Sequence, residues 1–347
     1  MADILAAACY TRPMLFIVPH LFPSPRLLET AAHDLRLPAL ETLLVRGSLQ
    51  DAPAEGLEAA LCEALGIARQ QDWPIAPLTL AAEGEAPGEA WWLRADPVHL
   101  RVMRDRIVLA GSEALALSRE EADALAAAIG RHFGAELAPR PYHPQRWYLR
   151  YADAPDLITT PLAVAIGRDI DPLLPQGADA MTFRSRLNEL QMLLHDHPVN
   201  AAREARGEPA VNSLWLWGGG RAPAPGRNPP SVHARHAATL ALAASCGARI
   251  HTLPGQLGAQ RLGTQDVVVL DTLTESGQVG DAWGWREAMR ALERDWFAPL
   301  RSQLRKTGPQ GVRLLDPDHG KALHLTAGDA WRVWRRPRSL LERLTKP

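Results

Sequence analysis

The chain has 347 residues, enough for two domains or for one large domain with an insertion. Its 38 basic and 39 acidic residues nearly cancel, so the overall charge gives no support for binding to nucleic acid or to an anionic membrane. No apolar run approaches the ~20 residues of a membrane helix. Its three cysteines, Cys9, Cys62 and Cys246, have no metal-binding spacing. We therefore expect a protein of the reducing cytoplasm with no nucleic-acid or membrane partner.

The first 72 residues predict one buried strand followed by helices. Residues 14–18 form a short apolar run typical of a buried strand, and three prolines interrupt the loop after it. Helices are expected over 26–35, 39–46 and 55–65. Ligands gather at the carboxyl ends of strands in open α/β sheets, which makes His20 a candidate catalytic residue. The alternative is a structural or merely exposed histidine.

Residues 73–186 predict an inserted α+β subdomain. A helix starting at Ser118 is expected to carry a capping box with Glu121. Strands are expected over 91–94, 100–102, 106–110 and 147–151. The flanking residues, 14–72 and 187–330, are expected to form an α/β core with a doubly wound, mainly parallel sheet.

Polar, aromatic and glycine residues concentrate between residues 195 and 223. Residues 211–217 predict a strand of the α/β core that breaks at Gly218, Gly219 and Gly220, where an anion could approach backbone N–H groups without meeting a Cβ. Trp217 would form a wall of this anion site. Donors that we expect to hold the anion are His197, Asn200, Arg203, Asn212 and Arg221. The alternative is a buried strand followed by a tight turn.

The C-terminal third predicts further core elements. Helices are expected over 234–244 and 283–304, and strands over 249–253 and 266–271. The second helix carries an apolar stripe that we expect to be core: Trp285, Met289, Leu292, Trp296 and Leu300. A hairpin is expected around 317–320. Residues 331–347 form a basic, tryptophan-containing tail, expected to be a solvated segment, with a partner surface as the alternative.

The central stretch resembles a known family. HPVN, the helix with Arg203 and VNSLWLWGGGRAP resemble archaeal-type cofactor-independent phosphoglycerate mutases of the alkaline phosphatase superfamily. A closer resemblance, nearly end to end, is to bacterial phosphoglycerate mutase-like proteins described as regulators of pathogenicity factors, E type. The segments that carry it are PHLFPSPR, LPALE, QQDWP, LRADPVHLRV, LNELQMLLHDHPVN and DWFAPL. The resemblance implies an alkaline phosphatase-like fold with an inserted subdomain.

The chain departs from the mutases at the residues that the resemblance makes catalytic. Their metal-binding Asp-Gly after the first strand is Pro19-His20 here, and we find no serine nucleophile motif. In the mutases, an aspartate and a histidine that bind metal follow the strand that corresponds to DVVVLD. Here no histidine follows this strand, and the metal candidates are Asp271 and Asp281. Asp318-His319 matches their C-terminal Asp-His formally, but it lacks the following Thr-Pro and is expected to be a coincidence. Phosphoryl transfer through a serine needs two dications, so we expect catalysis to be lost.

Three hypotheses follow. The first is a catalytically degenerate regulatory protein that binds a small phosphorylated or carboxylate ligand and needs no cofactor. The second is an active mutase or phosphoester hydrolase that uses Mn or Zn in a rearranged site of His20, His195, His197, Asp271 and Asp281. His195 and His197 have an alternative role as cations at a helix C-terminus. The third is a structural protein whose tryptophan-rich C-terminal part docks another chain.

Overall fold

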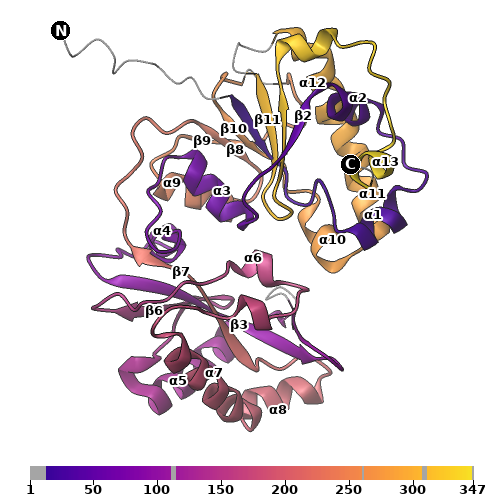
Figure 1. The fold of residues 1–347 in the computed structure, drawn as a ribbon. Helices are drawn as coiled ribbons and strands as arrows, with labels where there is room; N and C mark the ends of the chain where they lie inside the picture. Colours follow the sequence, from indigo (N-terminus) through magenta and orange to yellow (C-terminus); the bar gives the residue numbers. More distant parts are fainter. Residues whose placement is uncertain (1–12, 111–114, 260–261, 307–310, 346–347) are drawn as a thin grey trace, which may run out of the picture. The chain divides into compact units, whose positions relative to one another are not determined.

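The computed structural model describes residues 13–110, 115–259, 262–306 and 311–345, and the chain divides into two compact units (Figure 1). The first unit comprises the described residues up to Leu57, Pro230–Leu240 and those from Ala248 onward. The second comprises Glu58–Pro229 and Ala241–Gly247. The second unit is thus wider at both ends than the expected insertion, 73–186.

A mainly parallel sheet forms the centre of the first unit, as expected for the α/β class. Its described strands follow the order β2-β12-β11-β1-β10-β8-β9. Parallel neighbours are β11 (Val312–Asp316), β1 (Met14–Ile17), β10 (Val267–Val269), β8 (Val232–Ala234) and β9 (Ile250–Thr252). Antiparallel strands at one edge are β12 (Lys321–Leu325) and β2 (Ser48–Asp51). The pairing of β11 with β12 confirms the hairpin expected around 317–320.

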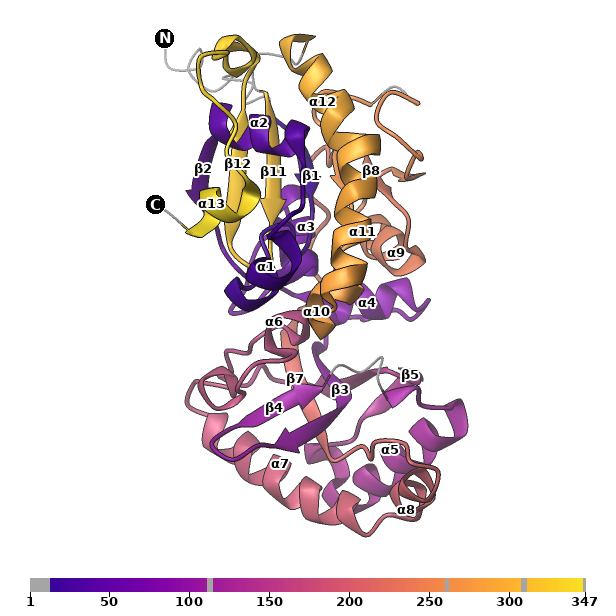
Figure 2. The ribbon, with the colours of Figure 1, turned by 90° about the vertical axis from the view of Figure 1, so that its right-hand side faces the viewer.

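Helices pack on this sheet, and a long helical rod is the most extended of them (Figure 2). The rod begins as α11 (Ala282–Leu292), passes through a π-helical turn (Glu293–Phe297) and continues as α12 (Ala298–Gln303). The stripe predicted to be core is buried along its whole length. The other helical elements of this unit are α1 (Pro25–Ala32), α2 (Pro38–Arg46), α10 (Thr274–Val279), α13 (Leu340–Thr345) and 3-10 turns at Leu304–Lys306 and Ala327–Trp331.

The second unit has an antiparallel sheet built around β3 (Trp91–Val102). On one side β3 pairs with β6 (Arg146–Tyr151) and β4 (Ile107–Ala110), on the other with β7 (Ser213–Arg221), and β5 (Arg140–His143) pairs with β6. The strands expected over 91–94 and 100–102 are therefore one strand. Pro97 fits within it because pairing with β6 ends at Arg94 and pairing with β4 begins at His99.

Helices cover this sheet, and α5 (Arg119–Phe133) begins with the predicted capping box. The Glu121 N–H donates to Ser118 Oγ, and the Ser118 N–H donates to Glu121 Oε2. The remaining helical elements are α4 (Ile75–Ala82), α6 (Leu162–Ala165), α7 (Ala180–His195), α8 (Pro198–Ala205) and 3-10 turns at Gly134–Glu136 and Asp171–Leu173. Two helices, α3 (Gly56–Ala64) and α9 (Ala237–Ser245), cross the boundaries between the units.

The strand expected over 211–217 belongs to the second unit and not to the α/β core. It pairs with β3 from Trp91 to Val98, and it continues through the three glycines to Arg221 instead of breaking there. The glycines permit close packing. A Cβ on Gly218 would lie 2.9 Å from Ile75 Cβ, one on Gly220 would lie 2.7 Å from Pro74 Cβ, and one on Gly219 would overlap the Trp91 ring.

Among the residues that the structure describes, no helix is both long enough and apolar enough to cross a membrane.

Gly219→Ala tests this packing. The added methyl group must displace the buried Trp91 ring, so we expect the free energy of unfolding to fall by about 1–3 kcal/mol. Gly130→Ala is the matched control within the same unit, because its Cβ would lie 3.9 Å from Ala138 Cβ and alanine favours a helix. Urea unfolding followed by circular dichroism measures both variants. An equal loss in both would contradict the close-packing role of Gly219.

Candidate functional site

Polar side chains converge at the carboxyl edge of the parallel sheet in the first unit. His20 follows β1, Asp271 follows β10, and Asp318 and His319 follow β11. Because β1 lies between β10 and β11 and runs parallel to both, their carboxyl ends share one edge. Ligands of open α/β sheets bind at this edge.

His20 is fixed in this edge by its backbone and by its ring. Its φ of 57° lies in the left-handed region, and its carbonyl accepts a 3.0 Å hydrogen bond from the indole of Trp285. The ring leaves no space for a side chain at Gly277, where a Cβ would lie 2.5 Å from His20 Cγ. Its Nε2 lies 3.7 Å from Asp318 Oδ2, and its ring centroid lies 5.1 Å from that of His319. These contacts hold the imidazole in one buried position.

Asp316 organises the turn that carries Asp318 and His319. Its fully buried carboxylate accepts hydrogen bonds at Oδ1 from the N–H groups of Asp318 (3.0 Å) and His319 (3.2 Å). Oδ2 accepts from the N–H of Phe22 at 2.8 Å and lies 3.2 Å from His319 Nδ1. One carboxylate thus links the loop after β1 to the turn after β11. Sequence analysis missed Asp316 and discounted Asp318-His319, and the structure places the latter pair beside His20.

Asp271 presents a buried acceptor on the neighbouring strand. Its Oδ1 has no hydrogen-bond partner among the described residues, and the Nε2 of His236 lies 3.7 Å from it. Burial raises the pKa of this carboxyl group, because a charge is costly to remove from water. Asp271 is therefore ready to accept a hydrogen bond from a ligand or a water molecule.

The residues present do not fit a metal pair like that implied for the mutases. Within the described parts of the chain, no group of three His, Cys, Asp or Glu side chains is arranged to hold a metal ion. Asp281, the other metal candidate, caps α11, since its Oδ1 accepts hydrogen bonds from the N–H groups of Trp283 and Gly284 at 3.1 Å each.

Asn200, Arg203 and Asn212 of the predicted anion cradle make hydrogen bonds within the second unit. Asn200 donates to the carbonyls of Leu194 and Val211 and accepts from the Val211 N–H, at 2.7–2.9 Å. Arg203 is fully buried, and its guanidinium donates to Glu121 Oε2 and to the carbonyls of Pro209 and Leu115. Asn212 exchanges two hydrogen bonds with the backbone of Leu100 and extends the β3–β7 ladder. Anion binding by these residues stays a prediction.

The remaining cradle residues also contact protein groups. The Gly218 N–H donates to Thr159 Oγ1, and Arg221 donates to the carbonyls of Glu89 and Ala152. His197 caps α8 through the Val199 N–H, and burial lowers its pKa. His195 is exposed at the end of α7.

Trp217 belongs to a buried ion pair that sequence analysis missed. Its indole donates to Asp96 Oδ2 at 2.8 Å, and the Arg94 guanidinium stacks 5.0 Å from the ring centroid. Arg94 donates to both Asp96 oxygens at 2.8–3.0 Å, and the Trp147 N–H donates to Oδ1 at 3.1 Å. The sequence did contain a signal for this pair. Arg94 and Asp96 carry opposite charges two residues apart in an apolar strand, and side chains at that spacing lie on the same face.

Comparison with known proteins supports homology to one group of enzymes. A 2,3-bisphosphoglycerate-independent phosphoglycerate mutase of Methanothrix thermoacetophila is 28% identical over 185 residues, 47% of this chain and 47% of the relative. The mutase of Methanosarcina mazei is 39% identical over 64 residues, 18% of this chain and 16% of that relative. The chain thus aligns with about half, or less, of the length of these relatives. No protein-family model matches the chain.

Solved structures give a weaker likeness. The cofactor-independent phosphoglycerate mutase of Thermoplasma acidophilum is 16% identical with a TM-score of 0.41, covering 97% of this chain and 95% of its own. A protein of Pyrococcus horikoshii is 14% identical with the same TM-score, covering 93% of this chain and 92% of its own.

Asn200→Ala tests whether this residue supports the fold. The substitution leaves two buried carbonyls and one buried N–H without their partner, so we expect a loss of about 2–4 kcal/mol in the free energy of unfolding. His195→Ala, at an exposed position nearby, should stay within about 0.5 kcal/mol of the parent. Chemical unfolding of both variants decides, and a neutral Asn200→Ala would contradict the structural role.

A second pair of variants tests the buried ions. Asp96→Leu leaves the Arg94 charge buried and unpaired, which should cost about 3–5 kcal/mol. The double variant Arg94→Met/Asp96→Leu removes both charges and should lose less than the single variant. Urea midpoints of the two proteins are compared. A double variant less stable than Asp96→Leu would show that the pair is not the source of the loss.

Proposed function

We propose that this phosphoglycerate mutase-like protein binds a small phosphorylated or carboxylate ligand at the carboxyl edge of its parallel sheet and serves a regulatory role without phosphoryl transfer. The observation that carries the proposal is the placement of His20 against His319 and Asp318, at the ends of β1 and β11. Homology to the mutases makes a phosphorylated three-carbon acid the first ligand to test.

The residue at the end of β1 favours an anion over a cation. The resemblance to the mutases implies an aspartate at Pro19, next to His20, and a carboxylate accepts hydrogen bonds and attracts dications. Pro19 offers no such carboxylate, and the adjacent His20 adds an imidazole, which can donate a hydrogen bond. Because Gly277 and Trp285 hold the histidine in place, its ring stays at the carboxyl edge instead of turning away from it.

The acidic residues of the edge are compatible with an anionic ligand. Both oxygens of Asp316 already accept backbone hydrogen bonds, which compensate its charge. Asp318 lies 3.7 Å from the His20 imidazole. Burial raises the pKa of Asp271, because it disfavours the charged form that would repel an anion.

Loss of catalysis is supported by the residue types. Phosphoryl transfer through a serine depends on dications that activate the hydroxyl and neutralise the phosphate. Pro19 stands where a metal-binding carboxylate is implied, and Asp281 is used as a helix cap. The resemblance to the E-type regulators favours binding without turnover.

Titration with 3-phosphoglycerate tests the proposal. We expect saturable binding, with about 2.7 kcal/mol of added stability at a concentration 100 times the Kd, seen as a raised Tm. His20→Asn keeps a residue that tolerates the left-handed backbone but loses the imidazole, and it should weaken binding about tenfold or more. His33→Ala, an exposed histidine of the same unit, is the control and should bind like the parent.

A coupled mutase assay with added Mn²⁺ or Zn²⁺ separates binding from catalysis. We expect no conversion of 3-phosphoglycerate to 2-phosphoglycerate. Metal-dependent turnover that a chelator abolishes would overturn the regulatory proposal in favour of an active mutase. Absence of any binding would overturn the ligand site itself.

A further inference from the structure

An arginine-lined cavity of about 340 Å³ lies in the first unit, away from the carboxyl edge. Its walls come from α2, from α12 and the 3-10 turn after it, and from the 3-10 turn after β12. The lining residues are Thr42, Arg46, Arg301, Ser302, Arg305 and Ala330. Figures 1 and 2 show α2 and α12 at the opposite end of this unit from α10, which contains Gly277 beside His20.

The helical rod sets the distance between this cavity and the carboxyl edge. Asp281 caps the rod near its start, and Arg301 lies 20 residues further along it. At 1.5 Å per residue, the two positions are roughly 30 Å apart. A small ligand in the cavity therefore cannot touch His20.

The charges of the cavity are not neutralised by its own lining. Three positively charged guanidinium groups meet there without a carboxylate in the lining. Two acidic residues adjoin the lining in the sequence, and both contact other groups. Glu41 Oε1 accepts from the Leu37 N–H at 3.4 Å. Asp329 Oδ1 lies 2.7 Å from Arg332, and its Oδ2 accepts from Thr326.

Each arginine is positioned by contacts that use only some of its N–H donors. Arg46 donates from Nη1 to the Ala330 carbonyl at 3.1 Å, but its buried Nε has no hydrogen-bond partner among the described residues. Arg305 stacks on Trp331, 3.9 Å from the ring centroid, which uses the face of the guanidinium and not its N–H edge. Arg301 makes one long contact of 3.4 Å to the Pro38 carbonyl.

The two hydroxyl groups supply no further donors to an anion. Thr42 donates to the Pro38 carbonyl at 2.6 Å, and Ser302 donates to the Pro299 carbonyl at 2.8 Å. Recognition in this cavity would therefore rest on the arginines, whose planar fork matches phosphate and carboxylate groups.

We propose that Arg46, Arg301 and Arg305 form a second anion site, which takes a compact ligand with two or more phosphate or carboxylate groups. A single negative charge would leave most of the cationic charge uncompensated, whereas a multivalent ligand can bridge two arginines. The volume is at the lower end of the range for small-molecule pockets, which favours a compact ligand over a polymer. Such a ligand would join α2, α12 and the 3-10 turn after α12.

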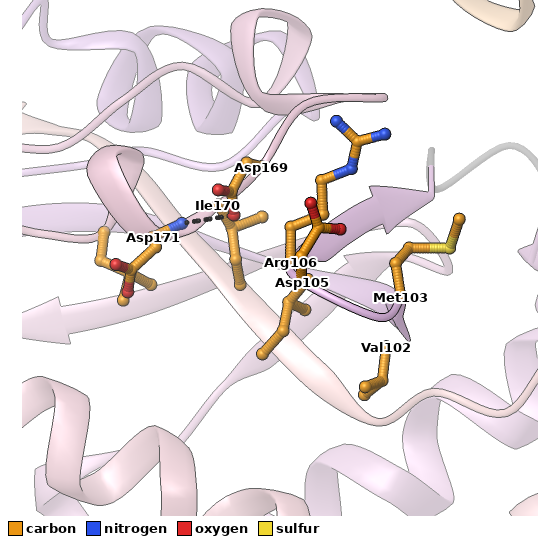
Figure 3. A pocket seen from close by; sticks show the side chains of 9 residues that line it. Val102, Met103, Asp105, Arg106, Asp169, Ile170 and Asp171 are labelled. Atoms are coloured by element: carbon orange, nitrogen blue, oxygen red, sulfur yellow. Dashed lines mark hydrogen bonds between the residues drawn. The ribbon is translucent and has the colours of Figure 1, made fainter.

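A cavity of similar size in the second unit shows the opposite character. It measures about 360 Å³, and Figure 3 shows Asp105, Asp169 and Asp171 around it together with Arg106. Exposed Met103 and Val102 add apolar surface there. Three carboxylates beside one guanidinium disfavour a multivalent anion, so the arginine-lined cavity is the one that we assign.

Isothermal titration of the full chain with pyrophosphate and with citrate, at constant ionic strength, tests the proposal. We expect one equivalent of binding that depends on Arg301 and Arg305, apart from any binding at the carboxyl edge, and the two probes decide between phosphate and carboxylate chemistry. Arg301→Ala and Arg305→Ala should each weaken binding about tenfold or more, because each removes a charge-assisted contact. Their Tm without ligand checks that both variants fold.

Two controls separate this site from general charge and from the carboxyl edge. Arg290→Ala removes an exposed arginine of the same rod that pairs with Glu287, and it should bind like the parent. His20→Asn should retain the arginine-dependent equivalent, whatever its effect on binding at the carboxyl edge. An equal loss in Arg290→Ala, an absence of saturable binding, or binding of heparin but of neither probe would overturn the compact-ligand site.

Discussion

A carboxylate buried in protein must accept several hydrogen bonds to offset the water it has lost, and Asp316 meets this requirement at the candidate site. Its oxygens accept hydrogen bonds from the N–H groups of Phe22, Asp318 and His319. These residues lie on two segments that are far apart in the sequence. The same interactions place His319 beside His20. The arrangement at the carboxyl edge therefore depends on one side chain that need not itself touch a ligand.

In the second unit, Asp96 is the buried carboxylate that accepts several hydrogen bonds. Its partners account for the position of part of the central stretch. Arg94, Trp147 and Trp217 all donate to that carboxylate, so Trp217 and the strand that carries it are committed to the sheet around β3. Asn200 and Arg203 likewise donate their hydrogen bonds to backbone carbonyls, and Arg203 also donates to Glu121. A cluster of donors in a sequence can thus mark a buried network as readily as a ligand site.

Local sequence patterns predicted where helices and strands occur better than they predicted which elements pack or pair together. Apolar periodicity gave the buried stripe from Trp285 to Leu300, and the Ser118–Glu121 spacing gave the start of α5. The strand 211–217 was assigned to the wrong sheet, because pairing with β3 depends on contacts more than 100 residues away. At the site, the strand-exit rule found His20, whereas Asp316 was missed because hydrogen bonds between distant loops have no signature in the sequence.

The π-helical turn in the rod has a consequence for how its apolar stripe stays on the core. Leu292, Trp296, Leu300 and Leu304 follow one another at intervals of four residues, and all are buried. In a regular helix, at about 100° per residue, three such intervals would rotate the stripe about 120° around the axis. The wider turn at Glu293–Phe297 accommodates one extra residue, and this removes about 100° of that rotation. A regular helix through all of these residues would turn the side chains beyond Phe297 about 100° away from the core, whereas deleting one residue in the turn would restore a regular helix and keep them on it.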